Sequence, residues 1–373
     1  MSRRAIYILI LFLTFAGSVL KAQDARIAHP FLWYSYYNPA YCGSEVSFKA
    51  DLGATQSYFY RNTVFVDSYL SAEIGTQKYN TIWGFGLKAL NEYQGSGLLN
   101  ISKISPALSV GMKWGEDWNA STHIRIGVQC DVLSAHINKN KMVFADQLDA
   151  YYGLVNQTSS ELEYIENDNL WGCDLGVGLF GQTSIPANRF QMPVIINYGF
   201  SAFNLIGEDT KSFYTGDKAL YLREALRNRR YCGQLECAVP YTSSKGMRMY
   251  FKAYGIYQYQ ATMQDVQVGL VYNVYKFMAG VGMKFEDFKK GRDFTNLLFH
   301  FVFSHPLSST VIMRIAYSGE LPLTQNGVGE TYSQAISLHF VWNTKRNTCD
   351  KHIHPTDVAW YEANNTFPTK SRK

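Results

Sequence analysis

The sequence predicts an all-β fold, a transmembrane antiparallel β-barrel of about 14 strands, and three observations support this prediction. Segments in which apolar and polar residues alternate recur along the chain, with turns between them. Charged residues make up 17% of the chain and aromatic residues 15%, a balance that suits a membrane wall with aromatic girdles. Beyond residue 22, no run of about 18 apolar residues predicts a membrane-spanning helix.

Residues 1–22 are predicted to be a secretory signal peptide. A positive pair, Arg3 and Arg4, precedes the apolar core Ala5–Ala16, and cleavage is expected after Ala22. An uncleaved membrane anchor is the alternative, and the shortness of the core disfavours it. We therefore expect an exported protein of the Gram-negative outer membrane.

The mature chain is expected to begin with an aromatic-rich stretch at Gln23–Ser44, which has the sequence QDARIAHPFLWYSYYNPAYCGS. Within this stretch, Asn-Pro marks the entry to a turn, and Gly-Ser frees the chain to enter a first strand. We expect an N-terminal segment at residues 23–45 that either lies in the periplasm or plugs the barrel lumen.

This stretch resembles the mature N-terminus of the PorP/SprF family, outer-membrane proteins associated with the type IX secretion system of Bacteroidetes. The family pattern is QD, then aromatic residues, then NPAYAG, and Cys42 replaces the second alanine of that pattern. The other residues of the motif match, namely Asn38, Pro39, Ala40, Tyr41 and Gly43.

The barrel is expected to occupy residues 46–342. Its strands are predicted near 48–53, 66–74, 82–90, 98–114, 122–132, 170–183, 194–206, 231–241, 246–259, 263–275, 277–286, 295–304, 309–319 and 332–342. A turn is expected at Asn91–Gly97. The last strand alternates strictly and ends in aromatic residues. We expect it to pair with the first strand, because closure removes the open edges of the sheet.

A second resemblance to the same family follows the fifth predicted strand. It is a phenylalanine–DQ–aspartate motif made of Phe144, Asp146, Gln147, Asp149 and Gly153. An acidic binding loop is one interpretation of this motif, and a structural turn is the favoured one.

Charged side chains on the predicted strands fall on one face. Charges that face lipid are costly, so this face is expected to line the lumen; a solvated face of a soluble β-sandwich is the alternative. The set mixes signs, which indicates internal ion pairing rather than selection for one solute charge. The predicted lumen-facing residues are Lys49, Asp51, Asp67, Glu73, Arg125, Asp131, Arg248, Lys252 and Arg314.

The lengths of the connections predict how the barrel is oriented. The two longest, near 137–169 and 206–230, leave from the same side and are expected to be extracellular. The polar tail at 343–373 is then periplasmic. Its possible donors Cys349, His352, His354 and Asp357 lack the spacing of a tetrahedral site, so a flexible tail is expected rather than a metal site. The six cysteines show no C-x-x-C spacing and are expected to be mostly buried small residues.

The resemblance implies an outer-membrane component that helps to export or attach particular type IX cargo proteins, including gliding adhesins. It implies partners among the periplasmic and outer-membrane components of that system, a secreted cargo protein and outer-membrane lipid. A passive pore or small-solute transporter is the alternative. The net charge of +5 gives no case for nucleic acid. No cofactor and no enzyme activity are expected, because the sequence lacks a G-x-S-x-G or metal motif.

Overall fold

The computed structural model describes most of the wall and part of the N-terminal segment. The described residues are 32–44, 48–59, 63–78, 80–94, 99–115, 121–138, 145–149, 153–155, 169–187, 192–206, 228–242, 248–260, 263–274, 276–286, 294–308, 310–323 and 332–342. The predicted signal peptide, the C-terminal tail and Phe144 lie outside these residues.

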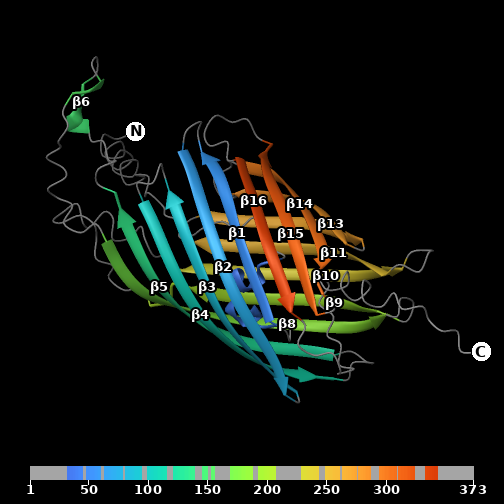
Figure 1. The fold of residues 1–373 in the computed structure, drawn as a ribbon. Helices are drawn as coiled ribbons and strands as arrows, with labels where there is room; N and C mark the ends of the chain where they lie inside the picture. The colour runs from blue at the N-terminus through green and yellow to red at the C-terminus, as the bar shows by residue number, and fades with distance from the viewer. Residues whose placement is uncertain are drawn as a thin grey trace, which may run out of the picture.

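Fourteen strands form one closed antiparallel barrel, which confirms the predicted fold class (Figure 1). Two further strands, β6 (Leu148–Asp149) and β7 (Gly153–Leu154), form a separate two-stranded sheet. The wall strands are β1 Phe48–Phe59, β2 Thr63–Lys78, β3 Thr81–Gln94, β4 Leu99–Trp114, β5 Ser121–Ile137, β8 Asn169–Ala187, β9 Met192–Phe203, β10 Arg230–Thr242, β11 Arg248–Gln260, β12 Met263–Val274, β13 Phe277–Glu286, β14 Phe294–Pro306, β15 Val311–Pro322 and β16 Tyr332–Trp342.

The barrel closes between its first and last strands, as the sequence predicts. β1 pairs with β16 in a continuous register that runs from Phe48 opposite Trp342 to Tyr58 opposite Tyr332. Each other wall strand pairs with its neighbours in chain order, and β5 pairs directly with β8 across the connection that carries β6 and β7. Closure therefore satisfies the edge hydrogen bonds that a membrane would leave unpaired.

Side chains alternate between the two faces of the wall. In β4, Leu108 and Met112 are exposed, whereas Ser109 and Lys113 are buried. The exposed apolar side chains form the outer face that meets lipid, because lipid accepts apolar groups and rejects charges. Aromatic side chains cluster on this face near the strand ends; for example, the Phe48 and Trp342 ring centroids lie 5.1 Å apart.

The structure differs from the sequence predictions at the end of β3 and at two cysteines. The prediction of a turn at Asn91–Gly97 is wrong for Asn91–Gln94, which belong to β3, and residues 95–97 lie outside the described residues. The expectation of mostly buried cysteines is wrong for Cys130 and Cys173, which are exposed on the outer face. Among the described residues, no helix has the length and apolar character needed to span a membrane.

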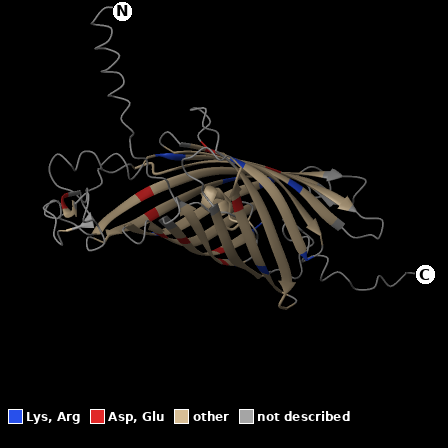
Figure 2. Ribbon diagram, turned by 90° about the horizontal axis from the view of Figure 1, so that it is seen from above, with Lys and Arg blue, Asp and Glu red and all other residues tan. Residues whose placement is uncertain are grey.

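The described part of the N-terminal segment lies inside the barrel. Residues 32–44, here called the lumenal segment, contain the short helix α2 (Tyr34–Tyr37) and the 3-10 turn η1 (Pro39–Tyr41). In the two perpendicular views of Figure 1 and Figure 2, the short coil of this segment lies among the strands of the barrel. Within this segment, η1 contacts β4, β5 and β8. Among the described residues, the interior of the barrel is thus occupied by part of the chain itself and contains an apolar cluster.

Candidate functional site

The sequence of the lumenal segment explains its shape. Asn38 has an extended backbone, and its Oδ1 accepts a hydrogen bond from the Ala40 N–H at 3.0 Å. Pro39 then starts η1, where a proline costs nothing because the first N–H groups of a helix have no partner within it. Gly43 has a φ of 61°, a conformation that favours glycine. The Asn-Pro-Ala-Tyr-x-Gly motif is therefore a capped turn that redirects the chain toward β1.

Charged wall side chains bind the backbone of this segment. Lys49 Nζ donates to the Leu32 carbonyl at 2.9 Å, and Lys88 Nζ donates to the Ser35 carbonyl at 2.7 Å. Arg125 Nη2 donates to the Cys42 carbonyl at 2.6 Å. These cations satisfy carbonyl groups that the short helical turns leave without a helical partner.

Neutral and acidic groups complete the binding of the segment. The Ser201 hydroxyl donates to the Tyr37 carbonyl, and the Asn38 side-chain amide donates to the Leu179 carbonyl at 2.8 Å. The Gly43 N–H donates to Glu73 Oε2 at 3.2 Å. The segment is thus held by strands on several sides of the barrel, which fixes its position as well as its depth.

Inward-facing glycines let the segment approach the wall closely. A Cβ built at Gly84 would overlap the Cys42 carbonyl, and one at Gly127 would overlap the backbone of Ala40. A Cβ at Gly178 would overlap Asn38 Oδ1. A glycine in a strand interior gives up side-chain packing and often marks the close approach of another backbone, so these glycines form a cradle for the motif.

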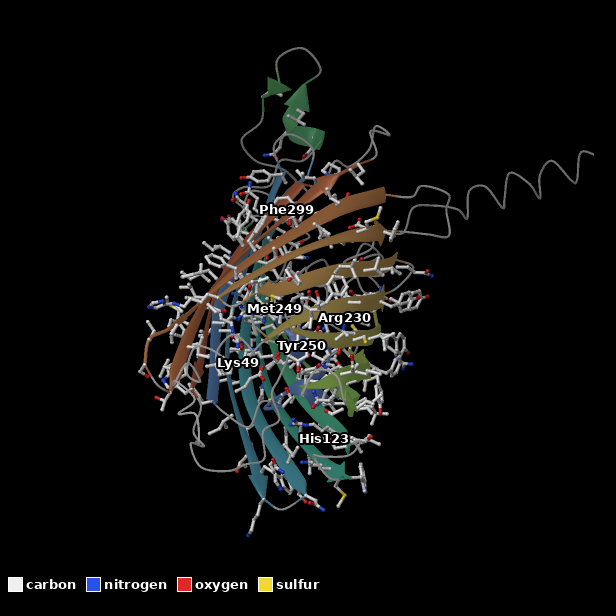
Figure 3. All side chains as sticks on the ribbon, turned by 90° about the vertical axis from the view of Figure 1, so that its right-hand side faces the viewer. Lys49, His123, Arg230, Met249, Tyr250 and Phe299 are labelled. Atoms are coloured by element: carbon white, nitrogen blue, oxygen red, sulfur yellow. The ribbon has the colours of Figure 1, made fainter. Side chains whose placement is uncertain are left out.

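Aromatic rings fill the space around the segment. Trp33 contacts Tyr69 of β2 edge to face, with ring centroids 3.7 Å apart. Tyr41 lies 4.0 Å from Phe180 of β8 between centroids. At the start of β10, the Arg230 guanidinium lies 4.7 Å from the Tyr36 ring centroid. The wall thus holds the segment at widely separated points, from Lys49 to Arg230 (Figure 3).

Several charged residues singled out in the sequence gather around the lumenal segment. Lys49, Glu73 and Arg125 bind it directly, and Asp51 lies 3.4 Å from Lys49 between charged atoms. The structure brings these four to one site from β1, β2 and β5.

Other residues of the same set lie elsewhere in the wall. Asp131 pairs with Lys103 at 3.0 Å, and Lys252 pairs with Glu236 at 3.2 Å. Asp67 and Arg314 are buried. The side chain of Arg248 lies outside the described residues.

Sequence reasoning missed several functional side chains, chiefly Lys88 and His339. Lys88 of β3 pairs with the buried, inward-facing Ser71 of β2. His339 lies two positions beyond the buried Ser337 in β16, on the same face of that strand. In β3, however, Gly84 and Gly86 occupy inward positions, so the apolar and polar residues around Lys88 do not alternate clearly. Assigning every inward position by parity would have found both residues.

Three residues at the barrel seam are arranged like a nucleophile, base and acid. Ser337 Oγ lies 2.8 Å from His339 Nε2, and His339 Nδ1 lies 2.7 Å from Asp51 Oδ1. Serine hydrolases use this order of groups, but their serine must reach a substrate carbonyl. Here Ser337 is 1% exposed and His339 0% exposed. The arrangement instead ties β16 to β1 where the barrel closes.

No metal site emerges in the described part of the chain, because no three His, Cys, Asp or Glu side chains there are arranged to hold an ion.

The second family motif forms a 3-10 turn at Ala145–Gln147 followed by β6 and β7. The Gln147 side chain is buried and that of Asp146 is exposed, while the Val155 N–H donates to the Gln147 carbonyl at 2.9 Å. Asp149 pairs with Gly153 in the two-stranded sheet.

Comparison with known families gives one match. The family described as "Type IX secretion system membrane protein PorP/SprF" matches residues 19–340. This range includes the whole lumenal segment and nearly all of β16. No curated protein matches the sequence.

Several solved structures of barrels resemble this chain at low sequence identity. The toluene transporter TbuX of Ralstonia pickettii is 8% identical with a TM-score of 0.43, over 87% of this chain and 96% of that one. The translocator domain of the autotransporter NalP from Neisseria meningitidis is 10% identical with a TM-score of 0.37, over 88% and 100%. CdiB from Acinetobacter baumannii is 8% identical with a TM-score of 0.42, over 79% of this chain, which spans 60% of CdiB. At these TM-scores the likenesses carry no argument about substrates or partners.

Proposed function

Because the chain belongs to the PorP/SprF family of type IX secretion system membrane proteins, we propose that it assists the export or surface attachment of specific cargo proteins by binding partners. Family membership makes it an outer-membrane component of that system. The observation that carries the proposal is the extent of the match, residues 19–340, which covers the described lumenal segment and the barrel together.

The filled lumen supports a binding role. Arg125 and His339 are at most 1% exposed, and Lys88 is buried against the lumenal segment. Inward charges that are covered by the protein's own chain are not available to select passing solutes. The proposed contacts with cargo and with other secretion components therefore lie at the two ends of the barrel.

The orientation of the barrel is part of the proposal. The connections after β5 and β9 leave from one end, and we place that end outside the cell because outer-membrane barrels carry their long loops there. Residues 343–373 then lie in the periplasm. Epitope tags at Ser159 and at the C-terminus test this placement on intact cells. Antibody access to the C-terminal tag alone would show that the barrel has the opposite orientation.

Comparing the secreted and surface proteomes of cells with and without the gene tests the function. We expect one or a few type IX cargo proteins, gliding adhesins among them, to be lost from the surface and trapped or degraded. Uptake of small solutes should stay normal, and a plasmid-borne copy should restore the cargo.

The alternative is a passive pore or small-solute transporter. It is favoured over the binding role only if cargo export is unchanged by the deletion while one nutrient no longer enters. The packing of aromatic rings and glycines around the lumenal segment argues against it, because neither feature serves an open pore.

A further inference from the structure

We infer that the lumenal segment stays in place while the protein handles cargo, so that the barrel is a sealed anchor through which no cargo chain passes. The reference to cargo rests on the proposed function, whereas the seal rests on the geometry of the lumen. Three features of that geometry carry the inference.

The first feature is the composition of the core. The lumenal segment contributes Leu32, Trp33, Tyr34, Tyr37, Ala40 and Tyr41 to the largest apolar cluster formed by the described residues. The wall contributes side chains from β2 and from every strand between β8 and β15. Departure of the segment would expose both sets to water, which the hydrophobic effect opposes. The segment is therefore the centre of the core of this barrel rather than an addition to it.

The second feature is the fit of the wall to one particular chain. The glycine cradle lies in close contact with the Asn38–Gly43 turn, since a Cβ at Gly178, Gly127 or Gly84 would overlap atoms of the turn. Gly199 adds a fourth such position, because a Cβ built there would lie 2.6 Å from Asn38 Nδ2. A conduit for varied cargo needs a wall indifferent to sequence, whereas this wall matches a single motif.

The third feature is the state of the wall opposite the cradle. Val271 and His300 are each 1% exposed, and Ala316 is fully buried. His300 also bonds to Tyr254 Oη at 3.0 Å and to Ser318 Oγ at 2.6 Å. A water-sized probe does not reach these three side chains, so a polypeptide could pass along this part of the described wall only by displacing the groups that cover it.

A disulfide between the wall and the segment tests the inference. Gly86 faces Cys42 so closely that a Cβ there would overlap the native Sγ, which the flexible end of the cysteine side chain can relieve. We expect Gly86→Cys to form a disulfide with Cys42 in oxidised cells, detected by mass spectrometry of unreduced peptides. The Gly86→Cys, Cys42→Ala double variant is the matched control and cannot form it. A Gly86→Cys barrel of normal abundance without the disulfide would contradict the position of the segment.

Cargo export is then compared between oxidised and reduced cells that carry the same Gly86→Cys protein. A resident segment predicts equal export in the two states. Export that stops on oxidation and returns on reduction, in the variant but not in the control, would overturn the inference. A failure of the proposed function is distinguishable, because it appears as unchanged export after deletion of the whole gene.

The wild-type protein supplies a second readout that needs no substitution at the cradle. Cys42 should resist a small membrane-permeable thiol reagent for as long as cells are exporting cargo, and should react once the barrel is unfolded. Alkylation of Cys42 that accumulates during export, and stops when export is blocked, would show that the segment leaves the lumen.

Discussion

Arg125 of β5 donates a hydrogen bond from Nη2 to the carbonyl oxygen of Cys42 at 2.6 Å, across 83 residues of sequence. The same Nη2 also donates to Ser109 Oγ at 2.6 Å, and Ser109 itself donates to the Cys42 carbonyl at 2.7 Å. One buried cation thus joins two wall strands to the lumenal segment. This contact explains why a charged residue occupies the interior of a membrane protein that has no evident solute to bind.

Replacing Arg125 by methionine, which keeps much of the side-chain volume, should loosen the segment. A hydrogen bond to a charged group contributes about 1.5–3 kcal/mol, so the free energy of unfolding should fall by about that amount. Urea titration of the detergent-solubilised barrel measures it. In Arg125→Met, Cys42 should also become more reactive toward a thiol reagent. Ile126→Ala, on the outer face of the same strand, is the matched control and should leave the resistance of Cys42 to that reagent unchanged. Equal resistance of Cys42 to the thiol reagent in both variants would contradict a stabilising role of the hydrogen bond from Arg125 to the Cys42 carbonyl.

Gly178→Val should displace the Asn-Pro turn, because the added Cβ would overlap Asn38 Oδ1. Overpacking of this kind costs about 1–3 kcal/mol, and the segment should become sensitive to protease added from the periplasmic side. Gly255→Val is the control, since the nearest atom to its Cβ is 3.9 Å away. Similar cleavage in the two variants would show that the cradle does not hold the turn.

The reactivity of Cys42 should depend on pH in an unusual way. Burial, with a smaller contribution from the negative charge of Glu73, raises the pKa of the Cys42 thiol to about 12. Only the thiolate reacts, so near pH 8 its ionised fraction should be about 1,000-fold below that of a thiol with a pKa near 9. In the folded barrel the alkylation rate should therefore rise about tenfold per pH unit from pH 7 to 10. A plateau near pH 9, as expected after unfolding, would indicate an exposed thiol.

His339→Ala should weaken the barrel seam. The substitution removes the bonds to Asp51 and Ser337 and leaves buried groups with fewer partners, at a cost of about 1–3 kcal/mol. The temperature at which the compact band is lost in semi-native electrophoresis should drop more than for Ile336→Ala, which truncates an outward-facing side chain. Labelling of Ser337 by a fluorophosphonate would instead reveal an accessible nucleophile.

The wall of this protein was largely predictable because lipid imposes a simple rule on it. Every second side chain of β16 must be acceptable to hydrocarbon, so Ile336 and Ser337 could be assigned to opposite faces from the sequence. The rule weakens where the wall leaves the apolar layer. There, Asn91 of β3 donates to Asn100 and Ser102 of β4, each at 2.8 Å, and these bonds extend strands through residues that otherwise signal a turn.

The position of the lumenal segment could be predicted only as one of two alternatives. Aromatic richness and the Asn-Pro turn are local signals, and they suit a periplasmic extension as well as a plug. The contacts that decide the matter join distant residues, such as Asn38 and Leu179, which are separated by 141 positions. Cys130 shows a similar limit, because a small apolar residue suits the lipid face as well as the core.

The measurement that tests the account most directly is the conductance of the purified wild-type barrel in a planar lipid bilayer. The central claim is that this barrel works by binding, with its lumen filled by residues 32–44. The account predicts no stable open-channel steps from the wild-type protein and frequent steps from Gly178→Val, in which the turn is displaced. Stable conductance from the wild-type barrel, equal to that of the Gly178→Val barrel, would contradict it.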